Sequence, residues 1–185
     1  MKKSNEALLV IDYTNDFVAS NGALTTGVVG QKIESEIIKL ANQELREDGW
    51  VFLPTDVHVE GDPYHPETKL FPAHNLKGAW GRDFYGQLQD WYDLNKANQR
   101  VKILDKTRYS AFAGTDLDMQ LRARKIDTVR LVGVCTDICI LHTAVDAYNL
   151  GYRIIINEKG VATFTEHGQE WALEHFKNAL GAQVE

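Results

Sequence analysis

The sequence has little cysteine, no long apolar run and no excess of positive charge over its 185 residues. The two cysteines, Cys135 and Cys139, could pair in principle, but in a reducing compartment we expect two free thiols. No window approaches the length of a transmembrane helix. A net charge of −6, with both signs mixed along the chain, argues against a nucleic-acid surface and against binding to an anionic membrane.

The N-terminal segment MKKSNEALLVIDYTNDF also lacks the features of a signal peptide. Its apolar run is short and is broken by Asp12, and it has no small-residue cleavage site. We therefore expect a cytoplasmic protein. The composition, with 44% apolar and 25% charged residues, is that of an ordinary globular chain, so residues 1–185 are expected to form a single domain around one sizeable core.

Strand-like and helix-like segments alternate along the chain. The apolar runs that predict strands cover residues 7–12, 50–56, 100–106, 127–134 and 152–157, with a short final strand at 182–184. The segments with helical spacing of apolar residues lie within 30–49, 115–125, 138–151 and 172–180. The apolar stripe of the third segment includes Val145 and Tyr148. Continuous Val/Ile/Leu strands between amphipathic helices indicate a doubly wound α/β fold, with a mostly parallel sheet and helices on both faces.

One long irregular stretch interrupts this alternation. It runs from about residue 57 to residue 98, and a short helix is expected within it around 83–92. A connection of this length inside a compact domain is usually functional. No internal repeat or linker divides the chain.

Polar side chains of three chemical types fall near the carboxyl ends of the predicted strands, where ligands bind in such sheets. Asp12 ends the first strand, Lys106 ends the third, and Cys139 lies a short turn beyond the fourth. Taken singly, the carboxylate could cap a turn, the lysine could be a solvated surface residue and the cysteine could be small core filling. Their joint placement at one edge of the sheet indicates a catalytic trio.

The trio has the chemistry of nucleophilic catalysis. A helix N-terminus and a nearby ammonium both lower a cysteine's pKa, so Lys106 and the helix start are expected to activate Cys139. Asp12 would take the thiol proton and return it to the leaving group. The backbone N–H groups of Cys135 and Cys139 lie at a helix start, where donors are free to bind the oxyanion of a tetrahedral intermediate. The Cys135 side chain is interpreted as structural.

A second group of polar residues follows the second strand. Asp56 and His58 form a D-x-H pair that puts two ligands on one side of an extended segment, and His74 can join them from the loop. Mixed nitrogen and oxygen ligands favour zinc, with iron or manganese as alternatives. The fourth protein ligand stays open between Glu67 and His65. The simpler interpretation is that these are loop residues that bind nothing.

These motifs together resemble the isochorismatase-like cysteine hydrolases, and among them the nicotinamidases. The resemblance covers nearly the whole chain and is carried by LLVIDYTNDF, TDVH…LFPAH, KTRYSAF and GVCTDICILHTAVDA. It implies a six-stranded parallel sheet, an Asp–Lys–Cys triad at the positions above, a cis Val134–Cys135 peptide bond and a divalent metal at the D-x-H…H residues. Glu67 matches the position at which some members have a glutamate ligand and others a histidine.

The resemblance also implies a substrate pocket and an activity. The aromatic residues that match the walls of the family's ring pocket are Phe17, Phe71 and Tyr109, with Trp80 as a further addition. The implied reaction is hydrolysis of nicotinamide to nicotinate and ammonia through a Cys139 thioester, in NAD salvage. The expected partner is a small molecule, nicotinamide or a pyrazinamide-like amide, and whether the chain forms a homo-oligomer stays open.

Other functions compete with this interpretation. The nearest is another amide or N-carbamoyl hydrolase of the same superfamily, since it would use the same triad. A vinyl ether hydrolase of the isochorismate type does not require the cysteine. Outside enzymes, a receiver-like switch domain also has an Asp and a Lys at strand ends, but it needs an acidic cluster after the first strand. A zinc-stabilised binding module should unfold on chelation.

Overall fold

A computed structural model describes residues 5–185 and contains a six-stranded, wholly parallel sheet with the order β3-β2-β1-β4-β5-β6. The strands are β1 (Glu6–Ile11), β2 (Trp50–Asp56), β3 (Val101–Lys106), β4 (Thr128–Val134), β5 (Arg153–Ala162) and β6 (Gln183–Val184). The predicted fold class is therefore confirmed. The strand bounds agree with the predicted ones closely, except that β5 continues to Ala162.

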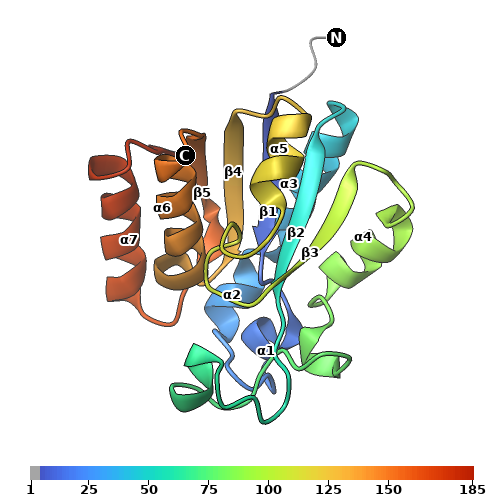
Figure 1. The fold of residues 1–185 in the computed structure, drawn as a ribbon, viewed down its shortest axis with the longest axis vertical. Helices are drawn as coiled ribbons and strands as arrows, with labels where there is room; N and C mark the ends of the chain where they lie inside the picture. Colours follow the sequence, from blue (N-terminus) through green and yellow to red (C-terminus); the bar gives the residue numbers. More distant parts are fainter. Residues whose placement is uncertain (1–4) are drawn as a thin grey trace.

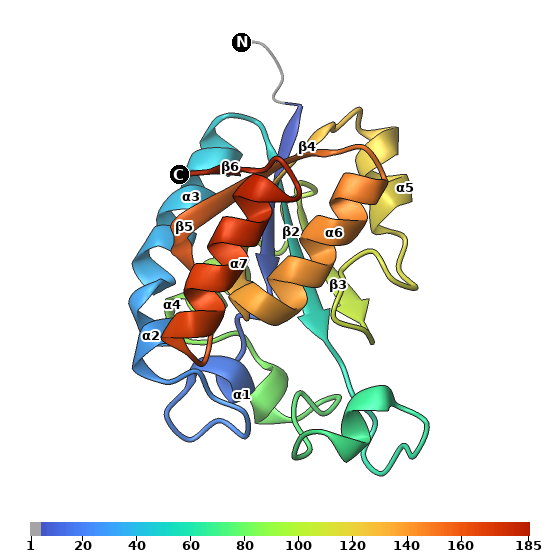
Figure 2. The same ribbon diagram turned by 90° about the vertical axis from the view of Figure 1, so that its left-hand side faces the viewer.

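Helices cover both faces of the sheet (Figures 1 and 2). The helices that pack on one face are α5 (Leu117–Ala123), α6 (Leu141–Asn149) and α7 (Glu166–Asn178). Those on the opposite face are α3 (Glu34–Arg46) and α4 (Gln87–Asn95), together with the short helices α1 (Asn15–Val18) and α2 (Val28–Lys32). Within residues 5–185, none of these helices has the length and apolar character needed to cross a bilayer.

The core has two layers because both faces of the sheet are covered. Side chains of β1 alternate between the layers: Leu9 and Ile11 pack on the side of α5, α6 and α7, and Leu8 and Val10 pack on the side of α3 and α4. All four are fully buried. A strand buried on both faces has no polar side, which is why β1 is a continuous apolar run in the sequence.

The strand order reverses between β1 and β4. β1 lies beside β2 on one side and beside β4 on the other, so the carboxyl ends of these strands flank a crevice. In Figure 1 these ends point toward the lower part of the molecule, where α1 and α2 lie. A receiver domain has the order 2-1-3-4-5 instead, so the receiver-like alternative does not fit this sheet.

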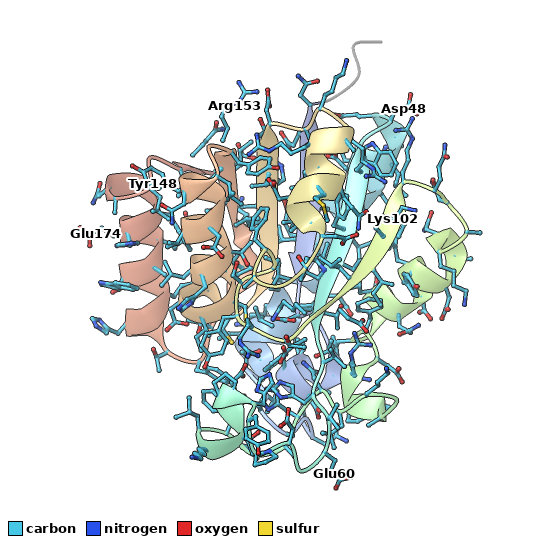
Figure 3. All side chains as sticks on the ribbon, viewed as in Figure 1. Asp48, Glu60, Lys102, Tyr148, Arg153 and Glu174 are labelled. Carbon is cyan, nitrogen blue, oxygen red and sulfur yellow. The ribbon has the colours of Figure 1, made fainter. Side chains whose placement is uncertain are left out.

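The connection between β2 and β3 is the long irregular stretch predicted from the sequence. It contains two short 3-10 helices, η1 (Pro66–Lys69) and η2 (Trp80–Arg82), followed by α4. Glu60 lies at its outer end, far from the sheet (Figure 3). The helix predicted around residues 83–92 starts several residues later, at Gln87. Gly86 precedes it with a φ of 51°, a left-handed conformation that favours glycine.

The predicted apolar stripe of α6 was wrong at Tyr148, whereas Ile138 and Leu141 pack, partly buried, against the core. Tyr148 is 53% exposed and points outward in Figure 3, whereas Thr143, Ala144 and Ala147 are buried. The π-helical turn η3 (Thr136–Ile140) precedes α6. A π turn has more residues than an α turn, so it rotates the positions after it relative to a uniform 3.6-residue count.

Candidate active site

The three side chains predicted from the strand ends meet beyond the crevice between β1 and β4. Lys106 Nζ lies 2.7 Å from Asp12 Oδ2 and 3.7 Å from Cys139 Sγ. All three side chains are buried. Parallel pairing places Lys106 opposite Asp56, and the β1–β2 pairing sets Asp12 beside the end of β2. Residues far apart in sequence are therefore brought together by the sheet itself.

Asp12 is held by hydrogen bonds to β2. It directly follows β1 and has a φ of 54°, in the left-handed region that Asp tolerates better than most residues. Its backbone N–H donates to the Pro54 carbonyl at 3.0 Å, and its Oδ1 accepts from the Asp56 N–H at 2.7 Å. The second oxygen, Oδ2, faces Lys106. The carboxylate is thus fixed on both oxygens.

Cys139 lies in the first turn of the helix that follows β4. The carbonyl of Cys135 accepts from the N–H groups of both Ile138 and Ile140, which makes this turn wide. The Val134–Cys135 peptide bond is cis, as the resemblance implied. Just before it, Gly133 has a φ of 114°, and a Cβ there would lie 2.0 Å from the Ile11 carbonyl. Only glycine lets β4 pass β1 this closely before the turn.

Burial dominates the electrostatics of the trio. It raises the pKa of Asp12 to about 6, against the lowering effect of the Lys106 ammonium. Burial opposes the charge of Lys106, yet Asp12, Cys139 and Asp56 raise its pKa above the ordinary value. The expectation of a lowered pKa for Cys139 was wrong: burial raises it well above the usual range, and Lys106 offsets this only in part. The resting thiol is therefore neutral, with Lys106 Nζ in contact with its sulfur.

A second buried group lies next to the trio. Asp56, His58, Glu67 and His74 each offer one ligand atom, and these atoms lie within 4.8 Å of one another. His58 Nε2 is 2.6 Å from Asp56 Oδ2, and His74 Nε2 is 3.5 Å from Glu67 Oε2. For the fourth ligand, this arrangement favours Glu67 over His65, because Glu67 belongs to the group and His65 lies beside it.

The donor set fits a divalent metal. His74 Nδ1 donates to the Pro72 carbonyl at 2.8 Å, the arrangement by which metal-binding histidines leave Nε2 free for the ion. Burial opposes a charge on His74, but the nearby carboxylates of Asp56 and Glu67 raise its pKa to about 10. The two carboxylates thus attract positive charge. Two imidazoles and two carboxylates form a possible metal-binding group of a kind that suits zinc.

A narrow apolar cavity of about 20 Å³ adjoins both groups. Its lining residues are Phe17, Leu24, Glu67, Phe71, Tyr109, Cys135, Ile138, Cys139 and Phe164. The predicted aromatic residues Phe17, Phe71 and Tyr109 are therefore brought to the cavity. Trp80 is not among the lining residues and is half exposed in η2.

Three lining residues were missed by the sequence reasoning: Leu24, Ile138 and Phe164. Phe164 lies two positions beyond the end of β5 at Ala162. It would have been a strand-end candidate if the strand had been predicted at its full length. Leu24 lies in an irregular segment, and no pattern in the sequence marks it.

Known proteins match this chain over nearly its whole length. The isochorismatase domain family matches residues 6–185. The sequence is 54% identical over 184 residues to the uncharacterized isochorismatase family protein PncA of Bacillus subtilis, covering 100% of this chain and 99% of that protein. The pyrazinamidase/nicotinamidase of Streptococcus mutans has a TM-score of 0.95 and 50% identity, over 97% of this chain and 99% of that one. The pyrazinamidase of Pyrococcus horikoshii in complex with zinc has a TM-score of 0.86 and 26% identity, over 98% and 99%.

Proposed function

The chain belongs to the isochorismatase family, and from this premise we propose that it is a nicotinamidase, an amidohydrolase that converts nicotinamide to nicotinate and ammonia. The observation that carries the proposal is the buried contact of Lys106 with both Asp12 and Cys139, beside a cavity with aromatic walls. The structural neighbours named pyrazinamidase and nicotinamidase support it.

Catalysis starts with proton transfer inside the trio. Because the pKa of Cys139 is raised, the thiolate forms only as the thiol proton moves to Asp12. The sulfur attacks the amide carbon of the substrate, and a C–S bond forms. Lys106 stays charged throughout, since its pKa is raised, and it stabilises both the carboxylate and the developing thiolate. The histidines take no part in this transfer.

The oxyanion of the tetrahedral intermediate is bound by the backbone N–H groups of Cys135 and Cys139. Their position at the wide turn before α6 supports this role, and one such donor is worth about 3–4 kcal/mol in the transition state. Asp12 then gives its proton to the nitrogen, the C–N bond breaks and ammonia leaves. Water, deprotonated by Asp12, cleaves the thioester, which releases nicotinate and restores the thiol.

The aromatic side chains and the buried ligand group orient the substrate. Phe17, Phe71 and Tyr109 line the cavity and would pack against a flat ring. Asp56, His58, Glu67 and His74 would hold a divalent metal, zinc in the first place with iron or manganese as alternatives. When bound, the metal supplies a Lewis acid for the ring nitrogen. This combination favours a heteroaromatic amide over the N-carbamoyl substrates of the nearest alternative.

The direct test is ammonia release from nicotinamide, pyrazinamide, N-carbamoyl amino acids and ureido acids. We expect nicotinamide and pyrazinamide to be the preferred substrates, and Cys139→Ala to lower turnover at least about 10³-fold. Cys135→Ala is the matched control, because it removes the other buried thiol but keeps the backbone N–H. It should retain activity within about tenfold.

Removal of the metal is a second test of the proposed function. Chelation should weaken nicotinamide hydrolysis while leaving the far-UV circular dichroism largely unchanged, because the ligand residues lie at the end of β2 and in the long connection after it, outside the core of the sheet. Preferred hydrolysis of an N-carbamoyl compound would contradict the proposed substrate. Near wild-type turnover of Cys139→Ala would contradict the covalent mechanism.

A further inference from the structure

His65 lies next to the four proposed ligand residues but is not one of them. Its side chain is buried, with 8% of its surface exposed, and its ring centroid is 4.2 Å from that of His58. Burying a polar imidazole costs free energy unless its nitrogens are hydrogen-bonded. The partners of its two nitrogens therefore decide what this residue can do.

Backbone groups occupy both ring nitrogens of His65. Nδ1 accepts from the Glu67 N–H at 3.3 Å, since an N–H group can only donate. The proton of the neutral ring therefore lies on Nε2, which donates to the Thr107 carbonyl at 2.9 Å. With one nitrogen accepting and the other donating, no lone pair is left for a metal.

These contacts join three parts of the site. The bond from the Glu67 N–H caps the first turn of η1 and fixes the backbone of a ligand residue. The bond to Thr107 reaches the residue that directly follows Lys106. The ring contacts that of His58, a second ligand residue, at an interplanar angle of 53°. A single side chain thus connects the long loop to the end of β3.

We infer that His65 is a positioning residue of the metal centre: it holds Glu67 and His58 in their ligating arrangement without binding the metal itself. The inference rests on the metal site of the proposed function. The sequence left the fourth ligand open between Glu67 and His65, and the inference assigns a role to His65. Its substitution should therefore weaken metal binding without removing a ligand.

The test measures zinc affinity of the full chain by competition with a chromogenic chelator, with no need for turnover. We expect His65→Ala to bind zinc about 10–100-fold more weakly, the loss typical of groups that orient metal ligands. The zinc stoichiometry should stay unchanged. His167→Ala is the matched control, because it removes an exposed histidine in the first turn of α7, and it should leave the affinity unchanged.

Two further substitutions separate the two hydrogen bonds and keep the test valid if the alanine variant does not fold. His65→Asn has an oxygen near the position of Nδ1 and can still cap η1. His65→Gln has a donor near the position of Nε2 and can still reach the Thr107 carbonyl. Each variant should recover part of the zinc affinity that His65→Ala loses. The melting temperature of each variant, measured in chelator, reports on folding separately from zinc.

The inference is overturned if His65→Ala binds zinc within twofold of the wild-type affinity. If the alanine variant does not fold, the same result for both the Asn and the Gln variant overturns it. A change in the cobalt(II) absorption spectrum of the Asn and Gln variants that indicates a lost nitrogen ligand also overturns it, because His65 would then be a ligand. If the wild type binds no zinc, the metal site of the proposed function is refuted as well. Zinc binding without nicotinamide hydrolysis would refute the proposed substrate and leave the role of His65 intact.

Discussion

Replacing Lys106 with methionine should destabilise the fold strongly. The ammonium is fully buried, 2.7 Å from Asp12 Oδ2 and 3.6 Å from Asp56 Oδ1. With an effective dielectric constant of about 20, the attraction to Asp12 alone is about 6 kcal/mol. Methionine retains an unbranched apolar stem but leaves Asp12 without a counter-charge, whereas Asp56 keeps His74 at 3.6 Å. Because the variant no longer buries an ammonium, part of the loss is offset, and we expect a net loss of about 3–5 kcal/mol at pH 7.

The loss should become smaller as the pH falls. Burial already raises the pKa of Asp12 to about 6, and loss of Lys106 removes the main effect that lowers it. In the unfolded chain the same carboxyl has an ordinary pKa of about 4. A folded-state pKa above the unfolded one means that the folded protein binds the extra proton, so its stability falls as the pH rises between the two values. The methionine variant should therefore be closer to wild type at pH 5 than at pH 7.

The assay is urea unfolding followed by far-UV circular dichroism at both pH values, with chelator in every sample. A double variant, Asp12→Asn with Lys106→Met, removes both members of the buried pair. It should be more stable than Lys106→Met alone at pH 7, although it contains one more substitution. A loss below about 1 kcal/mol for the single variant would refute this reasoning. So would a double variant whose loss equals the sum of the two single losses.

Two further predictions concern groups at different distances from the trio. Burial raises the pKa of Glu44 from 4.5 to about 7, so wild-type stability should fall between these pH values. In urea unfolding, Glu44→Gln should be more stable than wild type by up to about 3 kcal/mol at pH 8 and equal to it at pH 4. If the free energies of unfolding of the two proteins change with pH in parallel, the prediction is wrong. Phe71 lines the cavity and Trp80 does not. Phe71→Ala should therefore raise the KM for nicotinamide about tenfold in initial-rate assays and Trp80→Ala less than twofold, and equal increases would show that Trp80 contacts the substrate.

The proximity of the proposed catalytic residues could be predicted because it depends mainly on chain topology. Asp12 follows β1, Lys106 ends β3 and Cys139 follows β4, and the apolar runs of these strands are easy to recognise. Once the strands are parallel and adjacent, their carboxyl ends share one edge, so polar residues there must be close together. The same reasoning brought Asp56 to that edge. No side-chain detail was needed for this step.

Other features depend on packing that no local pattern carries. The pKa of Cys139 is raised because the whole site is buried, whereas the sequence shows only the nearby helix start and Lys106. The extension of β5 was missed because exposed Glu158 and Lys159 interrupt its apolar run before Val161 and Ala162 resume it. Phe164 was lost with that extension. The fourth ligand was undecided for a related reason, since the spacing of His65 and Glu67 cannot show which ring nitrogens are already bonded.

Asp56 explains why the trio and the ligand group cannot be treated as two separate sites. Its N–H donates to Asp12 Oδ1, its Oδ1 lies 3.6 Å from Lys106 Nζ, and its Oδ2 lies 2.6 Å from His58 Nε2. In the sequence it belongs to a D-x-H pair and has no link to the trio. In the structure its carboxylate lies between the Lys106 ammonium and the proposed metal ligands. The charge of Asp56 raises the pKa of both Asp12 and Cys139, so positive charge on the ligand side offsets this effect.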